Sequence, residues 1–266
     1  MNKHISKKIN DALQSQHNKA LLEIRNGKKQ GHWIWYVFPQ LAGLGSASGN
    51  KEYDIESPQL AIECLQNPRF LHNYHQTLTA LSESNGTSLR NIFQYDDVKV
   101  ISSLTLFEWA ASRIPQNQNI TDLQRTIQNV RNRFGKECCH RTQKKIQSYE
   151  KQKFQTVLQK LSESNEFKGK LSAEEIISIF VDANREGHYT NGKPRLPSDR
   201  AIDKGKAQLM RNFSVAFQKE CKNQDLTFSN TNGTNANGMR TKSVVKFLGV
   251  NDIVELQRIV NGAFGK

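Results

Sequence analysis

Apolar residues recur at three- and four-residue intervals along most of the chain, which is the spacing of amphipathic helices. Ile9, Leu13, Leu21 and Ile24 show this spacing first, and Gly27 is a suitable end for their helix. The strict alternation that is typical of strands is almost absent. The pattern therefore predicts an all-α protein. Further helices are expected over 57–68, 69–86, 96–112, 120–135, 146–161, 172–187, 199–222, 243–250 and 252–264.

Several of these segments begin with residues that commonly cap a helix. Ser57 precedes a proline, which is well tolerated at the first helical position. Asp96 or Asp97 can cap the helix that starts there, and Thr121 is expected to cap the helix after it. Ser172, with a glutamate three residues later, forms a capping box. These signals predict where the helices start.

The stretch 28–55 differs from the rest of the chain because aromatic residues crowd into it. It holds two of the three tryptophans, Trp33 and Trp35, in a run of rings that ends at Pro39. A loop rich in glycine and serine follows over 43–49. Aromatic rings can hold a base, and backbone N–H groups of a glycine loop can hold phosphate oxygens. The stretch therefore predicts a nucleotide-like ligand.

The same residues also have a purely structural interpretation. The rings could form a buried anchor between helices, with Gly43 and Gly45 as turn residues only. The glycines do not match the dinucleotide fingerprint, because their spacing differs and no βαβ unit surrounds them. Ser102, Ser103 and Thr105 lie near a buried helix face and need hydrogen-bond partners, either backbone carbonyls or a ligand.

Composition narrows the choice of partners. The net charge of +13 favours anionic partners: nucleic acid, nucleotides or an acidic membrane surface. The basic residues are spread along the chain, which weakens the nucleic-acid interpretation. Four cysteines form no disulfide pattern, and the adjacent Cys138 and Cys139 lack the separation that lets two sulfurs reach one zinc ion. We expect no metal and no cofactor.

The apolar runs are too short for a membrane protein, since none approaches the ~20 residues of a membrane span. The first residues also lack the apolar core of a secretory signal. We therefore expect a cytoplasmic protein without a membrane span. Export as an effector without a signal is the alternative.

Two segments together resemble a known family. The first reads G-H-W-I-W-Y-V-F-P-Q-L-A-G-L-G-S and then Y-x-I-x-S, and the second has Asp97 and Lys99 followed by S-S-x-T-L-F. These two segments are similar to the corresponding sequences of a family of small, mostly helical bacterial proteins, known as a domain of unknown function (number eighteen-ten) or as calpastatin-like. The resemblance covers about Ala20 to Ile146 and implies an all-α fold. Leu104 stands where that family usually has methionine, and everything after Ile146 is additional.

These observations predict two parts. We expect residues 1–150 to form an irregular helical bundle around the aromatic and glycine stretch. We expect residues 151–266 to form a helical extension that packs on this bundle. Because the extension is absent from the shorter relatives, it is a suitable place for recognising a macromolecular substrate.

Three functions fit the sequence. The first is hydrolysis of an N- or O-glycosidic ADP-ribosyl bond on a modified protein, for which a carboxylate must stabilise an oxocarbenium-like state and activate water. The second is a module that binds ADP-ribose or a related nucleotide without chemistry, and the third is nucleic-acid binding. The candidate catalytic acids are Asp97, Asp54 and Glu56. The candidate ligand contacts are Lys28, His32, Trp33, Trp35, Tyr36, Gln40, Gly43, Leu44, Gly45, Ser46, Tyr53, Ser103 and Thr105.

Overall fold

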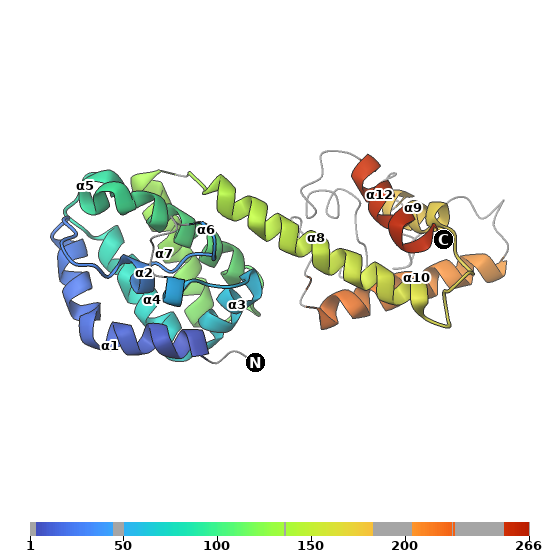
Figure 1. Cartoon of the computed structure of the whole chain (residues 1–266), viewed down its shortest axis with the longest axis horizontal. Coiled ribbons are helices and arrows are strands. Elements are labelled where there is room, and N and C mark those ends of the chain that lie inside the picture. Colours follow the sequence, from blue (N-terminus) through green and yellow to red (C-terminus); the bar gives the residue numbers. More distant parts are fainter. Residues whose placement is uncertain are drawn as a thin grey trace. The chain divides into compact units, whose positions relative to one another are not determined.

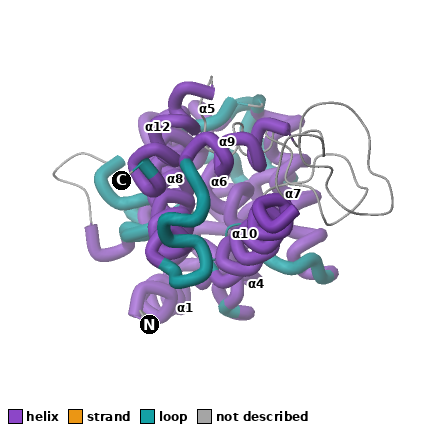
Figure 2. Tube along the Cα trace, turned by 90° about the vertical axis from the view of Figure 1, so that its right-hand side faces the viewer, coloured by secondary structure: helices purple, strands orange, loops and turns teal. Residues whose placement is uncertain are grey.

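The fold is all-α, as predicted. The computed structural model describes residues 4–44, 51–135, 137–182, 204–224, 226 and 253–265. In this part of the chain the regular structure is helical, and the one contact of strand type is a parallel bridge between Leu41 and Ile55 (Figures 1 and 2). None of the described helices combines the length and the apolar character needed to cross a bilayer. Contacts between Cα atoms divide the chain into two units, Met1–Ile146 and Gln147–Lys266.

The first unit is built on three pairs of packed helices. α1 packs against α4, α3 against α6, and α4 also against α7. α8 begins in this unit and continues into the second. The helices are α1 (His4–Arg25), α2 (Ile34–Val37), α3 (Pro58–Gln66), α4 (Pro68–Ser82), α5 (Leu89–Phe93), α6 (Asp97–Ala111), α7 (Gln118–Phe134) and α8 (His140–Glu163), with short 3₁₀ turns η1 (Lys51–Tyr53) and η2 (Gln94–Asp96).

Aromatic rings fill the core of the first unit. The ring centroids of Tyr74 and Phe107 lie 4.6 Å apart, and those of Phe38 and Phe93 lie 5.5 Å apart in an edge-to-face arrangement. Such pairs add to the stabilisation that burial of the rings gives. Phe38 comes from the aromatic stretch, so this stretch crosses the core as predicted. The predicted inner face of α1 is buried at all four positions, Ile9, Leu13, Leu21 and Ile24.

The helix starts test the capping predictions, and two of them are wrong. Ser57 caps α3, because its hydroxyl accepts the Leu60 N–H. Asn117, not Thr121, caps α7, since its side-chain oxygen accepts the Ile120 N–H at 3.0 Å. An amide oxygen one turn earlier therefore takes the role that the sequence suggested for the threonine.

The start of α6 also differs from the prediction. Asp96 occupies the N-cap position of α6, but its side chain makes no capping hydrogen bond. Asp97 is the first helical residue, and its carboxylate accepts the Val98 N–H at 2.9 Å. Neither aspartate therefore caps α6 in the expected way, because the Asp96 carboxylate is held by two lysines instead.

The second unit has its own aromatic core. It contains the later part of α8 with α9 (Ala173–Asp182), α10 (Lys204–Asn223) and α12 (Ile253–Phe264). Phe154, Phe180 and Phe217 meet with ring centroids 5.1 to 5.9 Å apart.

The capping box before α9 is confirmed. The Ser172 hydroxyl accepts the Glu175 N–H at 3.2 Å, and the Glu175 carboxylate accepts the Ser172 N–H at 2.7 Å. The expected short helix over 243–250 lies outside the described residues. Packing of the second unit on the first stays a prediction.

Candidate functional site

A buried carboxylate anchors the aromatic stretch to α1. One oxygen of Glu23, Oε2, accepts the N–H groups of Gln30 at 2.7 Å and Gly31 at 2.8 Å, and the indole N–H of Trp33 at 2.7 Å. Burial alone would raise the pKa of the Glu23 carboxyl, but these three donors outweigh burial and lower the pKa. Trp33 is only 1% exposed. The Trp33 ring is thus a core residue, which corrects its expected role as a ligand contact.

Two lysines meet on one aspartate beside the remaining tryptophan of the stretch. The ammonium groups of Lys29 and Lys99 lie 2.8 and 2.6 Å from the Asp96 carboxylate. Burial opposes ionisation of this carboxyl, and the two lysines outweigh burial and lower the pKa of Asp96. The Lys99 ammonium lies 5.1 Å from the ring centroid of Trp35, within cation–π range. One charged cluster therefore joins α6 to the aromatic stretch.

The bridge between Leu41 and Ile55 brings the end of the aromatic stretch next to Asp54. The Ile55 N–H donates to the Gln40 carbonyl at 2.7 Å. Because the bridge is parallel, Gln40 and Asp54 lie side by side. The Gln40 side-chain amide also donates to the carbonyl of Lys99 in α6, at 3.4 Å. Residues far apart in the sequence thus converge here.

Two tyrosines, Tyr36 and Tyr53, belong to the two segments that this bridge joins. Tyr36 and Tyr53 pack edge to face with ring centroids 5.3 Å apart, and both are half-buried. Trp35 is also half-buried. The three rings keep part of their surface open to solvent, unlike Trp33. Trp35, Tyr36, Gln40, Tyr53 and Asp54 are therefore the predicted residues that the structure brings together.

The three candidate acids have different surroundings. Asp97 lies 3.2 Å from the Arg90 guanidinium and also accepts a backbone N–H. Glu56 is exposed. Asp54 is half-buried, and burial raises the pKa of its carboxyl, while Lys51 acts in the opposite direction. In the described part of the chain, no hydrogen bond or ion pair engages the Asp54 carboxylate.

The predicted phosphate contacts are only partly described. Lys28, His32 and Gly43 are exposed, and Leu44 is half-buried. Gly43 has a φ of 72°, in the left-handed region that favours glycine. The remaining two predicted contacts of this loop, Gly45 and Ser46, lie outside the described residues.

The short hydroxyls of α6 have protein partners. The Ser103 hydroxyl and the Tyr74 phenol lie 3.2 Å apart. The Thr105 hydroxyl donates to the Ile101 carbonyl at 2.7 Å and accepts the Cys139 N–H at 2.9 Å. Both serine and threonine are buried. The structure therefore places Ser103 and Thr105 in helix packing, and corrects the expectation that they face a ligand.

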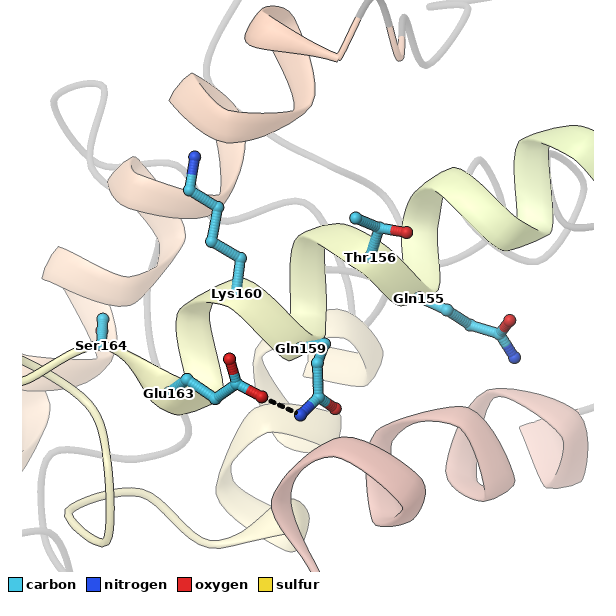
Figure 3. Close-up of a pocket in the computed structure, with 6 residues that line it drawn as sticks. All are labelled: Gln155, Thr156, Gln159, Lys160, Glu163 and Ser164. Carbon is cyan, nitrogen blue, oxygen red and sulfur yellow. Dashed lines mark hydrogen bonds between the residues drawn. The ribbon is translucent and has the colours of Figure 1, made fainter.

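Two hollows elsewhere contain none of the predicted residues. In the first unit, a cavity of about 470 Å³ is lined by aliphatic side chains, amides, His72 and His75. In the second unit, a hollow of about 580 Å³ lies along α8 (Figure 3). Its lining is polar, and there Gln159 hydrogen-bonds to Glu163. Neither combines a free carboxylate with aromatic rings among the described lining residues.

Sequence reasoning missed three charged residues of the candidate site, namely Glu23, Lys29 and Asp96. Each was hidden for a definite reason. Glu23 stands between apolar residues on the inner face of a helix. The sequence suggested a solvent-exposed cation at Lys29 and a helix cap at Asp96. The only available signal for Glu23 was a charged residue at a position where the helical pattern expects an apolar one.

Comparison with known proteins supports a family assignment for the first unit. A protein-family model described as "Protein of unknown function (DUF1810)" matches residues 4–133. Among solved structures, the crystal structure of the conserved hypothetical protein Rv1873 from Mycobacterium tuberculosis shares 32% identity, with 52% of this chain and 92% of that chain covered and a TM-score of 0.45. No curated protein matches the chain. Because the family model matches most of the first unit, and the mycobacterial relative matches over nearly its whole length, the chain belongs to the DUF1810 family of proteins of unknown function.

Proposed function

We propose that the first unit binds an ADP-ribose-like ligand and hydrolyses an ADP-ribosyl bond, with Asp54 as the catalytic carboxylate. The observation that carries the proposal is the state of Asp54. It is half-buried, lies beside Gln40 and next to Tyr53, and its carboxylate has no partner among the described residues. Cleavage of a ribosyl bond requires a carboxylate that no other group of the protein engages, and the half-buried rings beside it can hold the ligand.

The ligand class follows from the surrounding groups. Trp35, Tyr36 and Tyr53 offer partly open ring faces on which a base can stack. Gly43 is exposed, and among the described residues no acceptor takes its backbone N–H, so this group can donate to a phosphate oxygen. An ADP-ribose-like molecule has one base that can stack on the rings and two phosphates that can accept the Gly43 N–H.

The raised pKa of Asp54 fits a role in proton transfer. A carboxylate with a raised pKa is a stronger base and takes a proton more readily from the attacking water. It can also stabilise positive charge that develops on the ribose. Asp97 is less suitable for this role, because its carboxylate already neutralises Arg90 and accepts the N–H of Val98.

The test compares Asp54→Asn with Asp97→Asn in the full-length protein. The substrates are peptides with a single ADP-ribose on arginine, serine or glutamate, and ADP-ribose release is measured in single turnovers. We expect Asp54→Asn to slow release by ~10²–10⁴-fold and to leave ADP-ribose binding unchanged. Asp97→Asn should keep most of the activity. A fully active Asp54→Asn variant would remove Asp54 from the mechanism.

A binding module without chemistry is the second candidate function. The observation in its favour is the state of Asp97, the acid that matches the family pattern, which is engaged by Arg90. If this alternative holds, calorimetry will detect ADP-ribose binding to the wild-type protein, and none of the three linkages will be cleaved.

A further inference from the structure

A lysine from α8 lies beside Gly43, the first glycine of the glycine loop. A Cβ atom built on Gly43 would be 3.4 Å from the Lys145 Nζ, and among the described residues no other non-hydrogen atom outside the chain neighbours of Gly43 lies within 4 Å of it. Lys145 is exposed. Within the described residues, its ammonium group has no carboxylate at ion-pair distance. An unpaired cation therefore stands next to the exposed backbone of Gly43.

The position of Lys145 is fixed by the contacts of its helix with α6. The hydroxyls of Thr142 and Ser102 lie 2.8 Å apart in the core. The Cys139 N–H donates to the buried Thr105 hydroxyl at 2.9 Å. Ile146, the residue after the lysine, is buried in the core of the first unit. These contacts hold the first turns of α8, and with them the backbone of Lys145, against the first unit.

Three other described lysines of the candidate site do not take the place of Lys145 at Gly43. Lys29 and Lys99 share the carboxylate of Asp96, so their charge is partly compensated. Lys28, the cation expected from the sequence to hold phosphate, is not among the atoms within 4 Å of the Cβ position at Gly43. Among the described lysines, Lys145 is the one whose ammonium group lies within 4 Å of this position at Gly43.

We propose that Lys145 and the backbone of Gly43 form a phosphate subsite, which holds the pyrophosphate of the ligand. That the whole ligand is ADP-ribose rests on the proposed function. The affinity of this subsite for phosphate does not. Among the described residues, no acceptor takes the Gly43 N–H. The backbone of Gly43 has a φ of 72°, in the left-handed region, where a residue with a side chain would be strained. A backbone N–H together with an ammonium group is a common arrangement for phosphate oxygens.

The test is a titration of the full-length protein with sodium pyrophosphate, and then with ADP-ribose. Calorimetry gives the affinity, and the amide resonance of Gly43 reports the site. Lys145→Met should weaken pyrophosphate binding about tenfold, since it removes one charge-assisted hydrogen bond. Lys145→Arg should retain most of the affinity because the charge is kept. Lys144→Met is the matched control, because Lys144 is the adjacent exposed lysine of the same helix, and it should bind like the wild type.

The outcomes separate the subsite from the proposed function. Equal pyrophosphate binding by Lys145→Met and wild type, or a Gly43 resonance that does not respond, would overturn the subsite. Pyrophosphate binding that depends on Lys145, without any binding of ADP-ribose, would support the subsite and reject the ADP-ribose function. ADP-ribose binding that is the same in Lys145→Met and wild type would leave the function standing and reject the subsite. Unchanged thermal unfolding of the variants excludes a folding defect.

Discussion

At the scale of single residues, the two tryptophans of the aromatic stretch illustrate how neighbours acquire different roles. Trp33 is buried and donates its indole N–H to the carboxylate of Glu23, which also fixes two backbone N–H groups. Trp35, two residues later, is half-buried beside the Lys99 ammonium. Trp33 is the N-cap residue of the short helix α2 and Trp35 lies inside that helix, so the two side chains leave the backbone in different directions.

This difference predicts opposite effects of the two alanine variants. Trp33→Ala should lower the free energy of unfolding by ~3–5 kcal/mol, because it leaves a cavity and removes one of the three hydrogen-bond donors to the buried Glu23 carboxylate. Trp35→Ala should change the stability much less, but should weaken ADP-ribose binding by ~1–3 kcal/mol through lost stacking. Urea unfolding and calorimetry measure the two quantities. If Trp35→Ala binds ADP-ribose as tightly as wild type, this ring is not part of the ligand surface.

At the scale of helices, α4 is held to its neighbours by two buried or half-buried histidines. The ring of His17 in α1 lies 3.0 Å from the Thr77 hydroxyl of α4, and the ring of His75 in α4 lies 2.9 Å from the Thr126 hydroxyl of α7. Burial lowers the pKa of both histidines, and His72 lowers both further. The Asn73 carbonyl acts in the opposite direction on His17, and the Asp122 carboxylate does so on His75.

These pKa shifts predict a loss of stability in mild acid. The folded protein binds protons at the two histidines less readily than the unfolded chain does. The free energy of unfolding should therefore fall as the pH drops below the unfolded pKa of ~6.5, by at most about 1.4 kcal/mol per pH unit for each histidine. Urea unfolding between about pH 7.5 and about pH 5.5 measures this slope. A His17→Gln, His75→Gln variant should have a shallower slope, and an equal slope would show that other groups cause the loss.

At the scale of the whole molecule, each unit has a core of its own. The core of the first unit ends at Ile146, and the aromatic core of the second begins at Phe154. The family model matches residues within the first unit only. The first unit is therefore the part of the chain that the family model describes, and the second unit lies outside that match.

This division predicts that residues 1–150 fold without the rest of the chain. The fragment should unfold in one cooperative transition, because it contains every core residue that the structure describes in the first unit. It should bind free ADP-ribose like the full chain but lose activity on an ADP-ribosylated protein. Circular dichroism, calorimetry and a release assay test the three statements. A fragment that folds but no longer binds ADP-ribose would show that the second unit completes the site.

The sequence alone predicted the longer helices, two of the four helix caps and the burial of the aromatic stretch. These features depend on the local spacing of apolar residues and on the residues beside each helix end, as with Ser57 and the capping box at Ser172. The sequence could not determine which ring of the aromatic stretch is buried. It also could not determine which of the candidate acids is without a hydrogen bond or ion pair among the described residues. Those outcomes depend on neighbours that only packing supplies: Glu23 for Trp33, and Arg90 for Asp97. The approach of Lys145 to Gly43 was equally invisible, because no periodic pattern relates a loop to a helix far along the chain. Local chemistry fixes the elements, and the packing of α6 against its neighbours brings the charged groups of the candidate site together.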